Sequence, residues 1–276
     1  MSNTVGGHWA NLPSHGCFLY LERGLGATPQ ACRALIEQMT EGLGLGPDTL
    51  KVSTKDRALQ WSKFAWKKID AALENRHLSV TFLVGEPSEA HLGARIPITD
   101  KGVPDRTIDD PPNVWLAAES IRWPEERFVA VARSWFRTAA THCQVLSGGV
   151  FAAANMRNAK VEASREFEGL VGEAPDATNQ LIEKEPFALH AWEKVRRVYP
   201  ITLLGPKLAA RTSAEQLRAA GAVAVESVGE LLIFDATERL AEVWNRPYLD
   251  ATKKLRELVW PWSFQHPHDD PKRRGR

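Results

Sequence analysis

The sequence predicts an α+β fold with mixed or antiparallel sheets and packed amphipathic helices. Each half of the chain combines helical periodicity with strand patterns, and the clearest strand pair is a hairpin rather than a β-α-β crossover. Hydrophobic residues make up 43% of the 276 residues, which is enough to form a core. At roughly 150 residues per domain, this length allows either one large domain or two subdomains of similar size.

Two helices and a strand are predicted in the first hundred residues. The first helix has Thr28 as its cap and ends at Gly42. The second begins near residue 53, where Ser-Thr-Lys-Asp has the form of a capping box, and runs to about residue 75 with an apolar stripe. A strand at residues 78–84 follows. Residues 100–112 are rich in Pro, Asp and Gly and are therefore predicted to be a surface loop.

A strong helix with a strand on either side is predicted in the middle of the chain. The first strand covers residues 113–121. The helix opens at Trp123-Pro-Glu-Glu, with proline at its first position and two carboxylates that favour the positive end of the helix dipole. Its expected buried stripe is Phe128, Val131, Ala132, Trp135, Phe136 and Ala139. The second strand covers residues 147–154, where Gly148-Gly149 indicates a bulge or a close approach, and residues 156–169 are ambiguous.

The last quarter of the chain reads as a folding unit. Two strands, at residues 222–227 and 230–234, are joined by a tight Val228-Gly229 turn. Pro206 is suited to the first position of a short helix before them, and residues 247–258 follow as one amphipathic helix. A broken helix or two short ones are expected at residues 181–198, because Pro186 interrupts the pattern.

The best candidate for a domain boundary is the stretch Ala174-Pro-Asp-Ala. It separates an N-terminal α+β half, residues 1–174, from a C-terminal helix-hairpin-helix half, residues 175–264. A charged tail, residues 265–276, is expected to be disordered.

Composition argues against several classes of protein. The 35 basic and 34 acidic residues leave a net charge of +1, so direct nucleic-acid binding is not expected. The chain has three cysteines, Cys17, Cys32 and Cys143. This odd number, without C-x-x-C spacing, favours reduced thiols over disulfides or a zinc site. Neither a signal peptide nor a membrane span is recognised, so we expect a cytoplasmic protein that does not act at a membrane.

The sequence contains no motif that predicts catalysis, a cofactor or a metal. The glycines at residues 24–26 and 42–46 complete neither a dinucleotide fingerprint nor a P-loop. His142 and Cys143 are neighbours, and neighbouring side chains on a helix point about 100° apart. The His and Asp residues of the tail lack a folded support that would hold a metal ion.

Two weak candidates for a partner-binding surface stand out. Asp105, Asp109 and Asp110 form an acidic loop that fits either a basic partner surface or a plain solvated loop. Trp66 lies off the apolar stripe of the predicted helix, beside Lys63 and Lys67. It is either an interface anchor among charges or buried under another segment. Core packing is the first explanation for the other tryptophans, of which the chain has ten in all.

The C-terminal segment resembles a family of bacterial polymorphic-toxin immunity proteins, the immunity family fifty-two. The resemblance rests on Tyr199-Pro-Ile-Thr-Leu-Leu-Gly-Pro-Lys-Leu, the hairpin at residues 221–235, Arg246-Pro-Tyr-Leu, Leu255-Arg-Glu-Leu-Val-Trp-Pro, and the strand at residues 77–85. It implies a cytoplasmic antitoxin that binds a type VI secretion effector with a restriction-endonuclease-like domain. Because the similar residues are core positions, the resemblance implies no functional residues.

We therefore expect an immunity protein rather than an enzyme, one that neutralises a cognate nuclease effector by stoichiometric binding. An acidic loop can replace DNA phosphates on a basic groove, or the inhibitor can block assembly of the toxin. Two alternatives remain: a cytoplasmic enzyme with dispersed catalytic residues, and a ligand-binding regulatory module.

Overall fold

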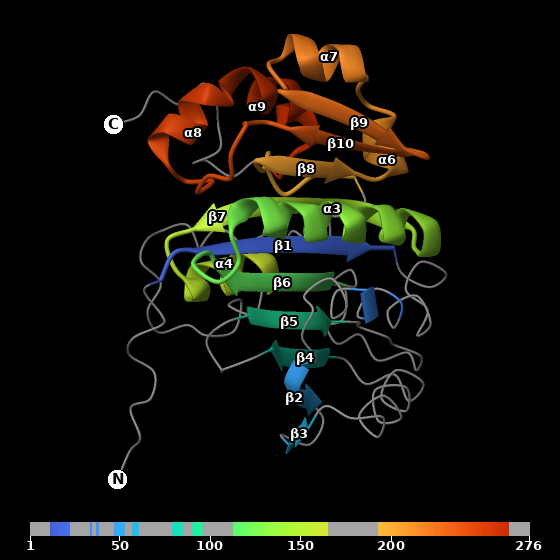
Figure 1. Ribbon diagram of the computed structural model, residues 1–276. Coiled ribbons are helices and arrows are strands. Elements are labelled where there is room, and N and C mark those ends of the chain that lie inside the picture. The colour runs from blue at the N-terminus through green and yellow to red at the C-terminus, as the bar shows by residue number, and fades with distance from the viewer. Residues whose placement is uncertain are drawn as a thin grey trace.

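The fold is built on one antiparallel sheet of ten strands (Figure 1). In the computed structural model, the described residues are 12–22, 34, 37–38, 47–52, 57–60, 79–84, 90–95, 113–164 and 193–264. The strand order is β3-β2-β4-β5-β6-β1-β7-β8-β10-β9, and the strands are antiparallel to their neighbours. Together with the helices, this arrangement confirms the predicted α+β class.

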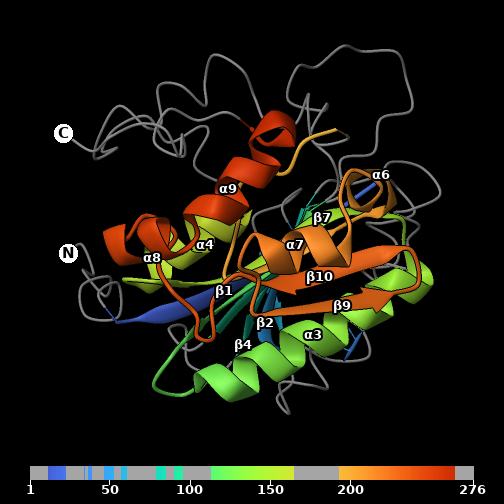
Figure 2. The ribbon, with the colours of Figure 1, turned by 90° about the horizontal axis from the view of Figure 1, so that it is seen from above.

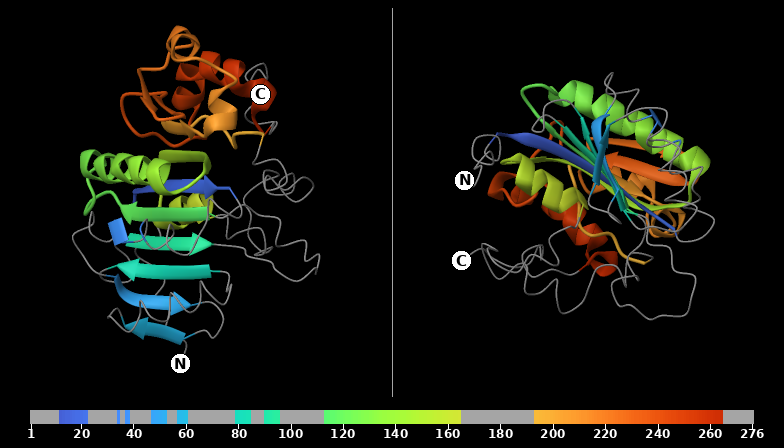
Figure 3. Two further views of the ribbon diagram at one scale, coloured as in Figure 1. Left: turned by 90° about the vertical axis from the view of Figure 1, so that its right-hand side faces the viewer. Right: turned by 90° about the horizontal axis from the view of Figure 1, so that it is seen from below.

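The strands are β1 Ser14–Leu21, β2 Pro47–Val52, β3 Arg57–Gln60, β4 Ser79–Val84, β5 Ala90–Arg95, β6 Asn113–Glu119, β7 Val145–Ala153, β8 Ile201–Leu204, β9 Ala224–Val228 and β10 Leu231–Asp235. The α-helices are α3 Glu125–His142, α4 Met156–Ser164, α6 Pro206–Ala209, α7 Ala214–Ala219, α8 Arg246–Ala251 and α9 Lys253–Val259, and Trp260–Trp262 forms a 3-10 turn. Helices cover both faces of the sheet: α3 lies on one face, and α4, α8 and α9 lie on the other (Figure 3).

Strand β1 lies at the centre of the sheet, between β6 and β7, and all eight of its residues are buried. The predicted close approach at Gly148-Gly149 is confirmed on β7. A Cβ on Gly149 would lie 2.6 Å from the ring of Tyr199, and one on Gly148 would lie 2.8 Å from the Phe18 carbonyl oxygen. The Tyr199 ring, which precedes β8, and the β1 strand therefore pack directly on the β7 backbone, because these glycines leave room for them.

Helix α3 is the longest helix among the described residues and packs against the central strands. Its expected stripe is confirmed at Phe128, Ala132, Trp135, Phe136 and Ala139, which are buried, while Val131 is half-buried. Pro124 is the N-cap rather than the first helical residue, with an extended ψ of 147°. Glu125 and Glu126 occupy the first turn, where the helix dipole favours carboxylates.

The last quarter of the chain extends the sheet by three strands and adds four short helices (Figure 2). The predicted hairpin is confirmed as β9 and β10, but its turn is Gly229-Glu230, one residue later than expected, because Val228 pairs with Leu231. Gly229 has a φ of +59°, the positive φ that tight hairpin turns require. Pro206 is confirmed at the start of α6.

The structure corrects three expectations. Arg57–Gln60, expected within the second helix, is strand β3, because pairing with β2 satisfies its backbone groups. The single helix expected at 247–258 is two helices that meet at Thr252, whose hydroxyl donates to the Tyr248 carbonyl at 2.8 Å. Such a side-chain bond to the preceding turn bends a helix without Gly or Pro. Residues 193–198, expected to belong to a broken helix, are irregular.

Besides β3, four strands were not predicted, namely β1, β2, β5 and β8, and α4 was left undecided. Strands β1 and β8 are buried throughout, so they lack the alternation that marks a half-buried strand. Ala34 and Glu37-Gln38 are helical, in agreement with the first predicted helix, and Gln38 Nε2 donates to Ser134 Oγ of α3 at 2.9 Å. The proposed boundary near residue 174, the loop 100–112 and the tail 265–276 lie outside the described residues, so the domain division stays a prediction.

Candidate partner-binding surfaces

The partner-binding residues predicted from the sequence are Lys63, Trp66, Lys67, Asp105, Asp109 and Asp110. All six lie outside the described residues, so this surface stays a prediction. The described part of the chain contains two other clusters of charged side chains, one on each face of the sheet, and a groove beside the hairpin.

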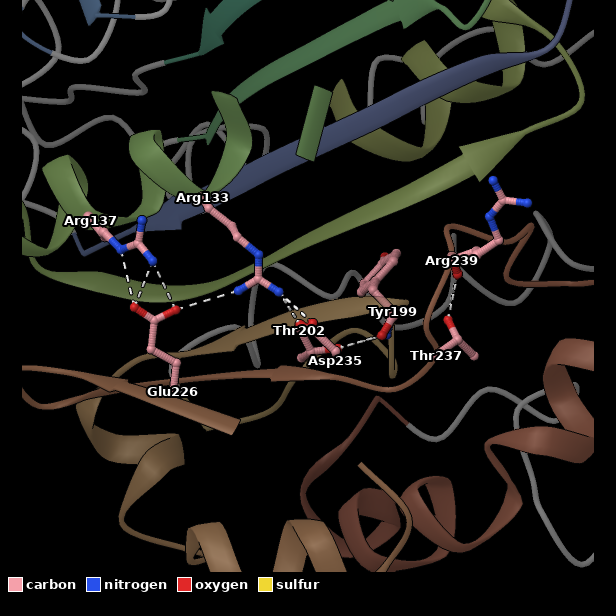
Figure 4. Close-up of polar contacts among 8 residues, drawn as sticks. All are labelled: Arg133, Arg137, Tyr199, Thr202, Glu226, Asp235, Thr237 and Arg239. Carbon is pink, nitrogen blue, oxygen red and sulfur yellow. Dashed lines mark hydrogen bonds and ion pairs between the residues drawn. The ribbon is translucent and has the colours of Figure 1, made fainter. Parts of the chain in front are cut away.

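The first cluster joins α3 to the hairpin (Figure 4). Arg133 donates through Nη2 to both carboxylate oxygens of Asp235 at 2.5 Å, and its Nη1 lies 3.5 Å from Glu226 Oε2. Arg137, one helical turn further on, donates to Glu226 Oε1 through Nε at 3.1 Å and through Nη2 at 2.8 Å. The spacing of four residues places both guanidinium groups on the same side of α3.

The charges of this first cluster balance, which points to a structural role. Burial raises the pKa of Asp235, the Arg133 guanidinium opposes that rise, and the Glu226 carboxylate adds to it. The exposed part of the cluster is the pair Arg137 and Glu226, whose side chains are 53% and 36% exposed. The cluster therefore holds the hairpin on α3 and leaves one ion pair at the surface beside β9.

Strand β9 forms one end of the sheet. The two-residue turn makes Val228 and Leu231 a hydrogen-bonded pair, so Ser227 and Val225 belong to the alternate positions whose N–H and C=O groups point away from β10. In agreement, Arg218 Nη2 donates to the Val225 carbonyl oxygen from outside the ladder at 3.3 Å. In the described ranges, no segment pairs with this outer side of β9.

A groove of about 430 Å³ lies between the C-terminal end of α3 and the hairpin turn. It is lined by Ala140, Thr141, Cys143, Gln144, Val145, Pro206, Val228, Gly229, Glu230 and Leu231. Glu230 is the only charged residue in this lining. Burial raises the pKa of the Cys143 thiol to about 11, so the thiol stays protonated near neutral pH.

The second cluster lies on the opposite face of the sheet, around Glu162 of α4. Glu162 Oε1 accepts a hydrogen bond from the Tyr199 hydroxyl at 2.7 Å, and its two oxygens lie 3.3 Å from Arg196 Nη2 and 3.5 Å from Arg197 Nε. Arg196 also donates to the Glu162 carbonyl at 2.6 Å, where a cation is favoured at a helix C-terminus. Burial, followed by the Glu162 charge, raises the pKa of Tyr199, which keeps the phenol neutral.

Trp244 covers this second cluster at the surface. The Arg197 guanidinium lies 3.6 Å from the centre of the indole ring, in a cation–π contact. Hydrogen bonds from Ala152 N to Ala241 O and from Asn245 N to Glu242 O hold the turn that carries Trp244. Core packing, which was the first expectation for this tryptophan, does not describe a side chain that is 41% exposed.

The described residues also include titratable groups that are ion-paired or buried. The carboxylates of Glu162, Glu226 and Asp235 are engaged in ion pairs. His15 is buried beside the Phe128 ring, and burial lowers its pKa, although Glu125 opposes that effect. Within the described ranges, no group of His, Cys, Asp and Glu is arranged to hold a metal ion, and no helix has the length and apolar character needed to cross a membrane.

The fold is similar to that of a solved structure, the Pseudomonas aeruginosa T6SS protein PA0821. The alignment has a TM-score of 0.61 at 12% sequence identity and covers 92% of this chain and 74% of that chain. At this identity the likeness shows a shared fold. No protein family model matches the sequence, so membership of the immunity family fifty-two stays a prediction. A search of curated proteins also found no match.

Sequence reasoning did not identify either charged cluster. The spacing of Arg133 and Arg137 could have marked one helical face as basic, because residues four apart are neighbours on a helix. No short-range sequence pattern indicates that this face pairs with Glu226, which lies 89 residues after Arg137 in the chain. The sequence around Trp244 could have indicated an exposed side chain, since its neighbours Glu242, Asn245 and Arg246 are polar.

Proposed function

We propose that this protein is an immunity protein that neutralises a cognate type VI secretion nuclease effector by direct, stoichiometric binding. The observation that carries the proposal is the fold shared with a T6SS protein over 92% of this chain. The sequence resemblance to the immunity family fifty-two supports it independently, because it rests on residues rather than on backbone shape.

The charged groups of the described residues are consistent with a binding function. The carboxylates of Asp235 and Glu162 are paired with arginines, which is how a protein stabilises its own fold, whereas acid–base catalysis needs groups that converge on a substrate cavity. An inhibitor needs only a surface of about 800 Å² that complements its target. Such an inhibitor meets a nuclease effector where the effector finds DNA, so the proposed place of action is the cytoplasm.

The test is co-expression with the product of the neighbouring gene. A neighbour that degrades DNA and kills cells alone, but is tolerated and co-purified with this chain, supports the proposal. Purified proteins then give the stoichiometry: DNA cleavage should fall linearly with added inhibitor and stop near a 1:1 molar ratio.

Two outcomes contradict the proposal. One is a neighbour that is harmless alone and does not co-purify with this chain. The other is loss of toxin activity at far below a 1:1 ratio, because one inhibitor molecule would then act on many effector molecules, as an enzyme does.

A further inference from the structure

The outer side of β9 has the properties of a site for strand addition. Its N–H and C=O groups at Val225 and Ser227 point away from the sheet, and extended peptides bind to such rows of groups. Natural edge strands are commonly protected by lysine, proline or a bulge. Strand β9, Ala-Val-Glu-Ser-Val, contains neither of these residue types and keeps an uninterrupted register with β10.

Both faces of the hairpin are covered, and no described segment pairs with the outer edge of β9, so this edge is the part that a partner can reach. Figure 2 shows β9 and β10 between α7 on one side and α3 on the other. Helix α7 contributes Leu217 to the same core as Phe234 of β10, while α3 contributes Arg137 to the ion pair with Glu226. Among the described residues, the outer edge accepts a hydrogen bond from the exposed Arg218, which an incoming backbone N–H can replace.

The groove lies at the end of this edge and favours a positive charge. Val228, Gly229 and Glu230 belong to both the hairpin end and the groove lining. The opposite wall is the C-terminal end of α3, where the helix dipole has its negative end. A carboxylate and a helix C-terminus facing one groove suit a lysine or arginine side chain.

We propose that an extended segment of the effector adds to β9 as the next strand and places a lysine or arginine in the groove. This inference rests on the proposed function, because a nuclease neutralises DNA phosphates with basic residues and therefore presents basic segments.

A second copy of this chain fits the edge less well than an effector segment. The symmetric register that uses both Val225 and Ser227 places the two Glu226 side chains directly opposite each other, and like charges there are unfavourable.

The matched variants are Ser227→Pro and Ser227→Ala. Proline removes the outward N–H and leaves the bonds to β10 in place, whereas alanine keeps the N–H and removes only the hydroxyl. Binding to a catalytically inactive form of the neighbouring-gene product is measured by calorimetry. We expect Ser227→Pro to weaken Kd at least tenfold and Ser227→Ala to change it less than twofold.

The groove is tested with Glu230→Lys, and Glu257→Lys on α9 is the control with the same charge change. We expect Glu230→Lys to weaken Kd about tenfold and Glu257→Lys to change it less than twofold. Hydrogen exchange of the wild-type complex checks the edge without any mutation, because the amides of Val225 and Ser227 should become protected on binding.

The outcomes separate this inference from the proposed function. A wild-type chain that neither binds nor inhibits the effector contradicts both. Tight wild-type binding with unchanged affinity of Ser227→Pro and Glu230→Lys, or with unprotected β9 amides, overturns strand addition and leaves the immunity function standing. A dimer of this chain that forms without effector and is lost in Ser227→Pro overturns the choice of occupant.

Discussion

Replacing Glu162 by glutamine should destabilise the fold far more than a typical surface substitution. The amide keeps the size of the carboxylate and still accepts the Tyr199 hydrogen bond, so the change removes only the negative charge. Glu162 is 12% exposed, and the Arg196 and Arg197 side chains beside it are 10% and 5% exposed. Two nearly buried guanidinium groups would then lose the attraction of the Glu162 charge.

The magnitude follows from this geometry. At the 3.5 Å that separates Glu162 Oε1 from Arg197 Nε, Coulomb's law with an effective dielectric constant of about 20 gives roughly 5 kcal/mol. Loss of one partner from a buried pair typically costs about 3–5 kcal/mol. The Trp244 ring still stabilises Arg197 by about 0.5–2 kcal/mol, so we expect a loss of about 3 kcal/mol in the free energy of unfolding.

Urea unfolding followed by far-ultraviolet circular dichroism at pH 7 measures this loss. Glu257→Gln is the matched control, because Glu257 lies 4.0 Å from Lys253 in an exposed pair and should cost less than about 0.5 kcal/mol. The loss in Glu162→Gln should persist at high salt, since buried pairs are weakly screened. A loss below about 1 kcal/mol would refute the assignment of Glu162 as an ion-pair partner that stabilises two buried arginines.

Three further results are expected. Gly205→Ala should lower the free energy of unfolding by at least about 1–3 kcal/mol in urea titrations, because the new Cβ would lie 2.0 Å from the Val145 carbonyl oxygen; wild-type stability would contradict this. Cys143, with a pKa of about 11, should react with iodoacetamide at pH 8 on the order of 100-fold more slowly than a free cysteine, and faster as the pH rises toward that pKa. Peptide mass spectrometry gives the rate, and rapid labelling at pH 8 would exclude a protonated thiol. Trp244→Ala should cost about 1 kcal/mol, because Arg197 loses its cation–π contact, and an unchanged melting curve would show that the contact contributes nothing.

Elements with a complete local signal were predicted well. Helix α3 has a proline at its start, carboxylates in its first turn and a continuous apolar stripe, and each of these acts within a few residues. The hairpin was also predictable from the local sequence, because β-branched and apolar runs flank a glycine that the turn requires. In contrast, the apolar run of β1 fits a buried strand or a buried helix, and only its two neighbouring strands decide between them.

The proposed binding edge has no local signature in the sequence. The sequence directed attention to Asp109 and Trp66 because charge and aromatic composition are visible locally. In contrast, the sequence does not indicate that β9 is an edge strand, since a five-residue strand can have the same sequence inside a sheet or at its end. Strand order is a long-range property, and it depends on which pairings bury the most apolar surface.

By itself, the sequence determined the α+β class, the start and buried stripe of α3, the hairpin and the glycines that allow close packing on β7, because propensity, capping and turn geometry act over a few residues. The tertiary structure decided the single continuous sheet, the central place of β1 and the free edge of β9. It also brought Arg133 to Asp235, 102 residues away along the chain. Such pairings depend on which distant surfaces fit together and exclude water, and no local pattern encodes that.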